Sequence, residues 1–407
     1  MPDAVIVDAV RSPIGRAFKG SLTQIRPDDL GAYVVDQLLE RNPEVSPDSI
    51  EDLICGCGLP QGEQSYNIGR IITLLSRLPD SVTGTTVNRY CASSLQAIRI
   101  ASHAVMAGEG HAYIAAGVEH VSRVGMWSEN GLPQLMTVMR QQAPDGVKEQ
   151  IPQADFQNPK LNGQDGRTNA YIEMGMTAEN VAERWDVKRE AMDEYAQRSQ
   201  ELAVQSRDEG FFDREIVPIE LPDGNTVSKD DGPRADSTVE KLASLKPAFK
   251  EDGRVTAGNS CPLNDGAAAV LVMSDTRAKE LGLKPRARVI ASATSGLEPE
   301  IMGVAPIGAI KNVLERAGMT IEDVDVVELN EAFAAQVLPI MDECNIPLEK
   351  LNPHGGAIAL GHPFGMTGAR IMTTLLNDLE TANKTVGLET MCVAGGQGMA
   401  MLVERLN

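Results

Sequence analysis

The sequence predicts an α/β protein whose core consists of two related halves. Helix-like and strand-like segments alternate, and one order of segments occurs twice along the 407 residues. Only 4% of the residues are aromatic, so the core must be built mainly from Ala, Val, Ile and Leu, as in sheets that helices cover on both faces. At about 150 residues per domain, the length fits two or three domains or one large fused core.

The first copy of the repeat begins at Pro27, where apolar residues at helical spacing predict a helix. Ser46-Pro47 is typical of a helix start, with the serine as N-cap and the proline in the first turn. The segments that follow are a strand at 52–56, a strand at 85–87, a helix that includes 95–98, and a strand at 112–117. Together they form one helix, strand, loop-helix, strand unit.

The second copy begins at Pro306, and its first helix is closed by Gly318. Thr320 then caps a short acidic turn. The segments that follow are a strand at 324–329, a loop at 351–354, a helix that includes 368–371, and a strand at 386–392. Duplication would place matching loops around a common site, although helices and strands also alternate in unrelated α/β proteins.

The stretch between the two copies differs in composition. It is rich in Gln, Asn, Asp, Gly and Pro up to Gly166, and the pattern then predicts one long polar helix from Thr177 to about Glu209. We interpret this stretch as an insertion that covers a site or an interface. The expected units are a first half at 1–120 and 253–275, an inserted domain at 121–252, and a second half at 276–407.

Charge and composition exclude several function classes. The 37 basic and 57 acidic residues give a formal charge of −20, which disfavours nucleic acid and anionic membranes as partners. Six cysteines are too few for a disulfide scaffold and suggest a reducing compartment. We expect a cytoplasmic protein, because no leader and no run of about 18 apolar residues is present. No phosphate-loop or dinucleotide fingerprint occurs, and we expect no metal site.

Two residues stand out as candidates for catalysis. Cys91 lies between a strand and a helix, where the helix dipole would lower the pKa of the thiol and favour the nucleophilic thiolate. The alternative is an inert, buried cysteine. His362 lies in a loop with glycines on both sides, which favours a general base over a structural histidine.

Cys392 and Asn330 follow strands of the second copy. Cys392 precedes a turn that contains Ala394, and the N–H groups of such a turn can stabilise an oxyanion. The alternative is a tight connection without a ligand. Asn330 could hold a water or a carbonyl oxygen, or it could cap the next helix.

These segments together resemble the thiolase family, whose members make or cleave 3-ketoacyl-CoA thioesters. The resemblance runs from Val7 to the C-terminus, and its anchors keep the family's order and spacing. The anchors are Val87–Cys91, Leu95–Ile98, Met174–Asn180, Asn264–Ala269, Asn330–Ala334, Gly361–Pro363 and Cys392.

The resemblance implies the fold and the roles of the candidate residues. The fold would be two βαβαβαββ halves in a five-layered αβαβα arrangement, with an inserted loop domain over a CoA tunnel. Cys91 would carry the acyl group with His362 as base, and Cys392 would move a proton to and from the acetyl α-carbon. One oxyanion hole would combine His362 with a water on Asn330, and the other the N–H groups of Cys91 and Ala394.

The resemblance also implies a set of contacts with CoA and the acyl chain, with CoA as substrate and no resident cofactor. Arg234 would lie near the nucleotide of CoA, with Lys246 close to it in sequence, although a surface ion pair is an equal alternative for Arg234. The other expected contacts are Met174, Cys261, Phe333 and His354. A homodimer or a tetramer is expected, and partner enzymes of fatty-acid oxidation are possible.

Several residues depart from the family pattern. Ser94 stands where a glycine is usual and would narrow the turn, and Cys261 stands where a serine is usual. Glu173 replaces the histidine of acetoacetyl-specific relatives, which favours the degradative branch and β-oxidation over a biosynthetic acetoacetyl-CoA thiolase. The third alternative is a non-catalytic protein that binds acyl-CoA.

Overall fold

The computed structural model describes residues 2–124, 158–166 and 168–406. The main sheet runs in the order β10-β11-β12-β9-β1-β8-β5-β3-β4, and β2 pairs with β8. Its strands are β1 (Ala4–Arg11), β2 (Gly15–Arg16), β3 (Asp52–Gly56), β4 (Thr83–Val87), β5 (Ala112–His120), β8 (Asn264–Ser274), β9 (Ala287–Gly296), β10 (Val326–Leu329), β11 (Val386–Val393) and β12 (Gln397–Arg405).

The sheet has the internal symmetry that the repeat predicts. In the first half β3 runs parallel to β5. Strand β8 lies between β5 and β1 and is antiparallel to both. In the second half β10 runs parallel to β11. Strand β12 lies between β11 and β9 and is antiparallel to both. The halves meet where β1 pairs with β9 through Val5↔Arg288 and Ile6↔Ala287. The two copies therefore form two half-sheets with the same strand order, joined by a short antiparallel contact.

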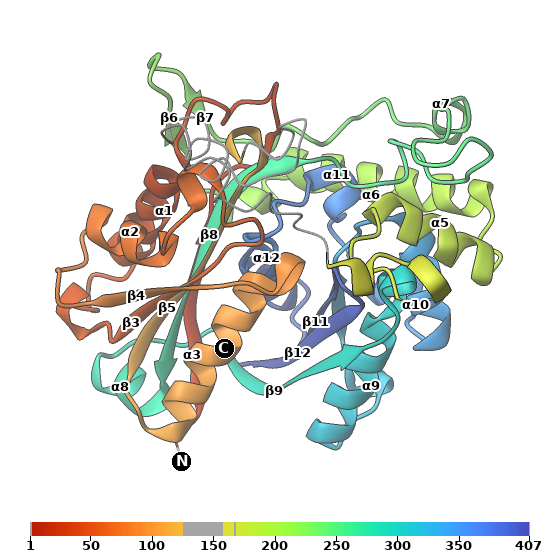
Figure 1. The fold of residues 1–407 in the computed structure, drawn as a ribbon. Coiled ribbons are helices and arrows are strands. Elements are labelled where there is room, and N and C mark those ends of the chain that lie inside the picture. The colour runs from red at the N-terminus through yellow and green to blue at the C-terminus, as the bar shows by residue number, and fades with distance from the viewer. Residues whose placement is uncertain (1, 125–157, 167, 407) are drawn as a thin grey trace.

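Helices cover both faces of each half-sheet. The helices of the two halves are α1 (Pro27–Arg41), α2 (Ile68–Leu75), α3 (Ser93–Ala107), α8 (Asp275–Glu280), α9 (Pro306–Ala317), α10 (Ala334–Glu343), α11 (Ala357–Leu360) and α12 (Thr367–Thr381). In Figure 1 the first half lies on the left and the second on the right, with α3 and α12 between them.

Alternating side chains along the strands divide the core into layers. In β8, Val270 and Val272 belong to the apolar cluster around α3 and α12, while Leu271 and Met273 belong to the cluster with α1 and α2. The strands of the second half divide in the same way between the α3–α12 cluster and the cluster around α9 and α10. Strands buried on both faces explain the apolar, aromatic-poor composition, and the result is the expected αβαβα order.

The described part of the segment between β5 and β8 lies over the top of both halves in Figure 1. Its described elements are α5 (Met174–Arg184), α6 (Arg189–Asp208), β6 (Ile219–Glu220), β7 (Thr226–Val227) and α7 (Val239–Ala243). The single long helix predicted from Thr177 to Glu209 is wrong, because the chain breaks between α5 and α6, where Asp186 has a φ of +50°. Most of the polar stretch before Gly166 lies outside the described residues.

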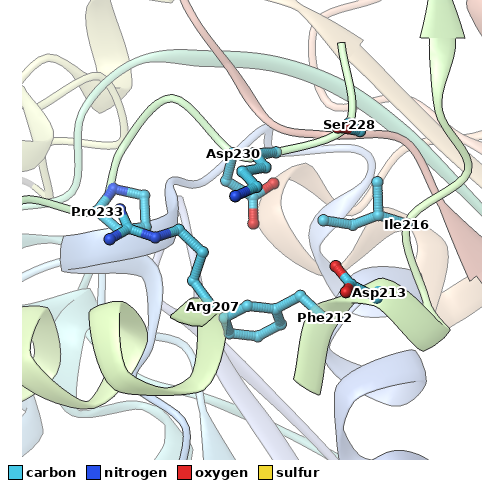
Figure 2. A pocket seen from close by; sticks show the side chains of 8 residues that line it. Arg207, Phe212, Asp213, Ile216, Ser228, Asp230 and Pro233 are labelled. Carbon is cyan, nitrogen blue, oxygen red and sulfur yellow. The ribbon is translucent and has the colours of Figure 1, made fainter. Parts of the chain in front are cut away.

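A buried ion pair fastens this segment to the core. Arg11 of β1 donates to both carboxylate oxygens of Asp230, at 2.7 and 2.9 Å, and to Glu215 at 2.7 Å. Figure 2 shows Asp230 directed at the gap between residues 228–233 and Phe212. The gap has a volume of about 10 Å³, room for one water at most. The ion pair between Arg11 and Asp230 is therefore a packing contact, and it fixes the position of the chain just before Arg234.

Among the described residues, no helix is both long and apolar enough to cross a membrane. In the same part of the chain, no group of three or more His, Cys, Asp or Glu side chains is arranged to hold a metal ion.

Candidate active site

Loops from both halves meet at the N-terminal ends of α3 and α12. The turn that carries Cys91 follows β4 and packs against β11 and the start of α12. A Cβ on Gly368 would lie 2.3 Å from the backbone nitrogen of Leu95, and a Cβ on Gly56 would lie 2.3 Å from that of Ser94. These contacts leave no room for side chains, so the two glycines allow the matching loops to approach each other.

The Cys91 turn is held in a strained conformation. Tyr90 has a φ of +43°, which is unfavourable for a residue with a bulky side chain. Its N–H donates to Oδ1 of Asn88 at 2.8 Å, and its carbonyl accepts from the hydroxyl of Ser93 at 2.6 Å. This network places Cys91 in a short 3₁₀ helix that runs directly into α3.

Three thiols lie close together at this point. Enclosure by protein raises the pKa of the Cys91 thiol well above its usual range, and the neighbouring thiols of Cys392 and Cys261 raise it further. The N–H groups of Ala394 and Cys91 oppose this shift. The lowered pKa expected from the position of Cys91 before a helix is therefore wrong, because desolvation of the thiolate outweighs the stabilising donors. A base must remove the Cys91 proton during the reaction.

His362 is oriented as such a base. Its Nδ1 lies 2.6 Å from Oγ1 of Thr367, whose hydroxyl donates to the carbonyl of Pro363 at 2.8 Å. The hydroxyl hydrogen of Thr367 is donated to the carbonyl of Pro363, so the hydroxyl oxygen accepts the hydrogen bond from Nδ1–H of His362. The imidazole therefore carries its hydrogen on Nδ1 and its free lone pair on Nε2. Nε2 lies 3.3 Å from Nδ2 of Asn330. The structure thus brings His362 and Asn330 into direct contact.

The loop of His362 is fixed from both halves. Its backbone N–H donates to Oδ1 of Asn264 at 2.9 Å. Burial lowers the pKa of the His362 imidazole to about 3, and the positive charge of Arg370 adds to the effect. Oδ1 of Asn330 is buried without a protein partner in the described part of the chain, so it can accept a hydrogen bond from a water or a substrate.

Cys392 is the penultimate residue of β11, and Ala394 begins the turn to β12. Gly395 and Gly396 have φ values of +79° and +81°, and a Cβ on Gly396 would lie 2.1 Å from the carbonyl oxygen of Leu297. The glycines are therefore required by this turn, which directs the N–H of Ala394 at Cys91. Burial raises the pKa of the Cys392 thiol to about 11.

Gln336 contacts Cys392, and the sequence analysis did not identify it. Nε2 of Gln336 lies 3.0 Å from Sγ of Cys392, and this donor opposes the rise in the thiol's pKa. The sequence feature that could have identified Gln336 is its polar amide side chain inside the apolar run Ala334–Ile340. A buried polar residue in such a run needs a partner.

Cys261 joins the wall of the site through the backbone. Its N–H donates to the carbonyl of Ala332 at 3.0 Å, and burial raises the pKa of its thiol to about 12. Phe333 packs edge-on against Phe249 with ring centroids 6.1 Å apart. Met174, Phe249 and Cys261 pack against the apolar cluster that contains Phe333 and Cys392. The wall beside the thiols is therefore apolar.

Arg234 lines a cavity of about 170 Å³ together with Arg16, Gln200 and Ser260. Its backbone N–H donates to Oε1 of Gln200 at 2.8 Å. The positive charge of Arg234 is among the causes that lower the pKa of Asp236, and Asp231 acts on Arg16, so the alternative of a surface ion pair for Arg234 remains open. Lys246 is exposed and is not among the residues that line this cavity.

His354 has contacts of another kind. Its ring stacks on Phe211 with centroids 3.5 Å apart, Nδ1 lies 2.7 Å from the hydroxyl of Ser206, and Nε2 lies 3.3 Å from Asp378. Both ring nitrogens and one ring face are used in packing the inserted segment against α12. These contacts give His354 a packing role, and its expected contact with substrate stays a prediction.

Glu119 connects the loops of the two halves and was also not identified from the sequence. It accepts from the backbone N–H of Gly58 at 2.8 Å in the first half and from that of Gly365 at 2.9 Å in the His362 loop. Burial raises the pKa of its carboxyl to about 7. Its position at the end of an otherwise apolar strand was the only sequence signal.

Ser94, one of the departures from the family pattern, has a structural role in the contact between α3 and α12. Its Oγ accepts from the backbone N–H of Ala369 at 2.9 Å, so it ties the first turns of α3 and α12 together. Glu173 is the N-cap residue of α5 and makes no side-chain cap bond.

Comparison with known proteins decides the family. A model of the thiolase N-terminal domain matches residues 4–276, and a model of the thiolase C-terminal domain matches residues 283–405. The chain belongs to the thiolase family. The predicted resemblance is therefore confirmed over nearly the whole chain.

Individual relatives of this thiolase agree. A protein of Acinetobacter baylyi named beta-ketoadipyl-CoA thiolase is 44% identical, and a 3-ketoacyl-CoA thiolase of Idiomarina loihiensis is 43% identical, each over 100% of both chains. The crystal structure of the Bacillus anthracis acetyl-CoA acetyltransferase has a TM-score of 0.86 and 37% identity, and it covers 100% of this chain and 99% of that chain. The predicted fold is confirmed, and the chain is an acyltransferase that performs thiolytic acyl transfer between 3-ketoacyl-CoA and CoA.

The state of His362 leads to a prediction about pH. A base works only when it is neutral, so its activity is lost as the pH falls through its own pKa, which for His362 is about 3 instead of 6.5. We therefore expect kcat/KM for acetylation of the free enzyme by acetyl-CoA to vary less than about twofold between about pH 5 and pH 8. A decline with a midpoint near 6.5 in this stopped-flow measurement would show that His362 is solvated like a free imidazole.

Proposed function

We propose that this thiolase works in the degradative direction on 3-ketoacyl-CoA with an uncharged acyl chain, through an acyl group on Cys91. The proposal rests on the convergence of Cys91, His362, Asn330 and Cys392 from four segments. His362 would take the Cys91 proton on Nε2, and the thiolate would attack the 3-keto carbon. The backbone N–H groups of Cys91 and Ala394 would stabilise the resulting oxyanion.

Cleavage of the carbon–carbon bond would leave the electron pair on the acetyl-CoA enolate, whose oxygen lies against His362 and Asn330. Cys392 would then give its S–H proton to the α-carbon and recover a proton from His362, and acetyl-CoA would leave. The thiol of free CoA would next give its proton to His362 and attack the acyl group on Cys91, whose departing sulfur would take that proton and become a thiol again. Two separate half-reactions follow, with Cys91 needed in both and Cys392 in the carbon–carbon step.

The half-reactions give the first test. We expect Cys91→Ser to abolish acetylation and thiolysis, because a hydroxyl is a far weaker nucleophile than a thiol. Cys392→Ala should keep acetylation of Cys91 by acetyl-CoA, seen as the added mass of an acetyl group, while thiolysis of acetoacetyl-CoA falls by about 100-fold or more. Equal loss of both half-reactions in Cys392→Ala would contradict the separate role of Cys392.

The substrate range follows from the apolar wall made by Met174, Phe249 and Phe333. Met174, Phe249 and Phe333, the described residues that form this wall, carry no positive charge, and the carboxylate of Glu173, next to Met174 in the chain, would repel a second carboxylate. These features favour an uncharged chain, as in fatty-acid β-oxidation.

A second candidate is the cleavage of beta-ketoadipyl-CoA, which carries a terminal carboxylate. Relatives from Acinetobacter baylyi and Escherichia coli that are 43–44% identical have names of this kind. The two candidates differ only in the charge at the far end of the acyl chain.

Two six-carbon substrates separate these candidates. We expect kcat/KM for thiolysis of 3-ketohexanoyl-CoA to exceed that for 3-ketoadipyl-CoA by about tenfold or more, because burial of an unpaired carboxylate is costly. Spectrophotometric rates at matched CoA concentration provide the comparison, and acetoacetyl-CoA serves as a control for the shared chemistry. The reverse preference would establish the dicarboxylate substrate.

Arg16 and Arg234 would bind the phosphates of CoA at the mouth of the cavity. Burial and the neighbouring Arg234 lower the pKa of Arg16, and the carboxylate of Asp231 opposes this shift only in part. An anionic ligand would relieve the repulsion between the two arginines. Local positive charge is required because the protein as a whole has a formal charge of −20.

Substitution of either arginine tests this site. We expect Arg16→Ala and Arg234→Ala each to raise the KM for CoA by about fivefold, the effect of one partly exposed ion pair, with kcat nearly unchanged. Arg277→Ala provides a matched control, because Arg277 pairs with Glu280 on the surface of α8. An unchanged KM in both variants would place the CoA phosphates elsewhere.

A homodimer would form through β4, which is the last strand on the sheet path. An unpaired edge strand invites pairing with a second copy. Large apolar side chains are exposed beside it, and these are Tyr66, Ile71, Leu74, Leu75 and Tyr90. Such a cluster is typical of an interface.

Light scattering tests the dimer. We expect a mass of two chains of 43.7 kDa each, and dissociation when Leu74→Asp and Leu75→Asp are combined, because two buried charges would face each other across the two-fold axis. A monomer for the unmodified chain, or an intact dimer for the double variant, would contradict pairing through this face.

A further inference from the structure

Gln336 occupies an unusual position behind the reacting thiol. It lies in the first turn of α10 and is fully buried. Its Nε2 is 3.0 Å from Sγ of Cys392, on the neighbouring strand β11. A Cβ on Gly303 would lie 2.8 Å from Oε1 of Gln336, so the glycine makes the room that the amide occupies. The side chain is therefore packed in place against the sulfur.

The hydrogen bonding of this amide is incomplete. Oε1 of Gln336 is buried and has no partner among the described residues. A buried amide oxygen without a partner loses its hydration without compensation, and an apolar side chain of similar length would avoid this cost. Packing alone therefore does not explain a glutamine here, whereas donation to Cys392 does.

We propose that Gln336 is a positioning residue that stabilises the thiolate of Cys392 while this residue exchanges a proton with the acetyl α-carbon. The inference rests on the proposed role of Cys392. In cleavage, the S–H bond of Cys392 breaks, a C–H bond forms on the enolate, and the electron pair remains on sulfur. In condensation, the thiolate takes the α-proton. In both directions the sulfur carries a negative charge during the step, and an N–H donor favours this charged form.

The surroundings of Cys392 make this donor effective. The sulfur is buried, and the groups that act on its pKa in the described part of the chain include no side-chain cation. The N–H of Gln336 is the side-chain donor to this sulfur in the described structure. A donor that is already aligned in an enclosed site costs no reorganisation when the charge appears, and the loss of one such donor slows reactions by about 10²–10³-fold.

The experiment uses Gln336→Met, which keeps the length of the side chain and removes the donor. Acetylation of Cys91 by acetyl-CoA should stay within about twofold of the unmodified enzyme, because Cys392 takes no part in it. Thiolysis of acetoacetyl-CoA should fall by about 10–1000-fold. The exchange of acetyl protons of acetyl-CoA with deuterium from the solvent, followed by NMR, should fall by a similar factor, and its alkaline pH dependence should move to higher pH.

Val337→Ala provides the matched structural control, because Val337 is the buried apolar neighbour on the same helix. It should lower the unfolding temperature and leave the ratio of the two half-reactions and the pH profile unchanged. Gln336→Asn keeps the amide group but shortens the side chain by one methylene, which moves the amide away from the sulfur of Cys392. This variant replaces Gln336→Met in the experiment if the methionine variant does not fold. It should show the same selective loss of proton exchange.

Two results would overturn the role of Gln336. One is full proton exchange in the folded Gln336→Met or Gln336→Asn variant, and the other is an equal loss of acetylation and thiolysis. Failure of the underlying mechanism gives a different result, because Cys392→Ala would then retain the carbon–carbon step.

Discussion

The contact between α3 and α12 at the centre of the molecule is the constraint on which the site depends. Each helix belongs to one half of the repeat, and each is buried between the half-sheets, so their first turns can meet only if the loops before them also meet. Gly56 and Gly368 provide the required space, and the hydroxyl of Ser94 accepts the backbone N–H of Ala369 across the contact. This arrangement brings the Cys91 turn of the first half to the His362 loop and the β11–β12 turn of the second. Glu119 reinforces it, because one carboxylate accepts N–H groups from loops of both halves.

Burial also determines the chemical state of the reacting groups. The thiols of Cys91 and Cys392 are held protonated and the imidazole of His362 is held neutral, since each charged form would lose its hydration. Charge must therefore appear only during the reaction, at points where donors are already in place. The N–H of Ala394 faces Cys91 and the amide of Gln336 faces Cys392. Thr367 fixes the tautomer of His362, so that the lone pair is on Nε2 beside Asn330. Arg16 and Arg234 line a cavity whose lining residues do not include Cys91, Cys261 or Cys392.

Sequence patterns predicted the duplicated core well and the details of the inserted segment poorly. The two helix starts at Pro27 and Pro306 and the strands around them agree with the structure because local propensity and the needs of a doubly covered sheet coincide there. The long helix expected from Thr177 to Glu209 breaks at Asp186, whose left-handed backbone lets α5 and α6 each pack against α10. The family resemblance implied a substrate contact for His354, and its ring stacks on Phe211 of the inserted segment. Proximity along the chain did not decide proximity in space.

The sequence by itself determined the family, the two related halves and the identity of the groups that can react, because these depend on the order and spacing of residues such as Cys91, Asn330, His362 and Cys392. Only the tertiary structure decided their protonation states, the tautomer of His362, and the partners Gln336, Glu119 and Arg16. Each of these properties depends on burial and on distances of a few ångströms between segments that are far apart in the chain. Gln336 and Cys392 are separated by 56 positions but by 3.0 Å between donor and sulfur, and no local pattern carries that information.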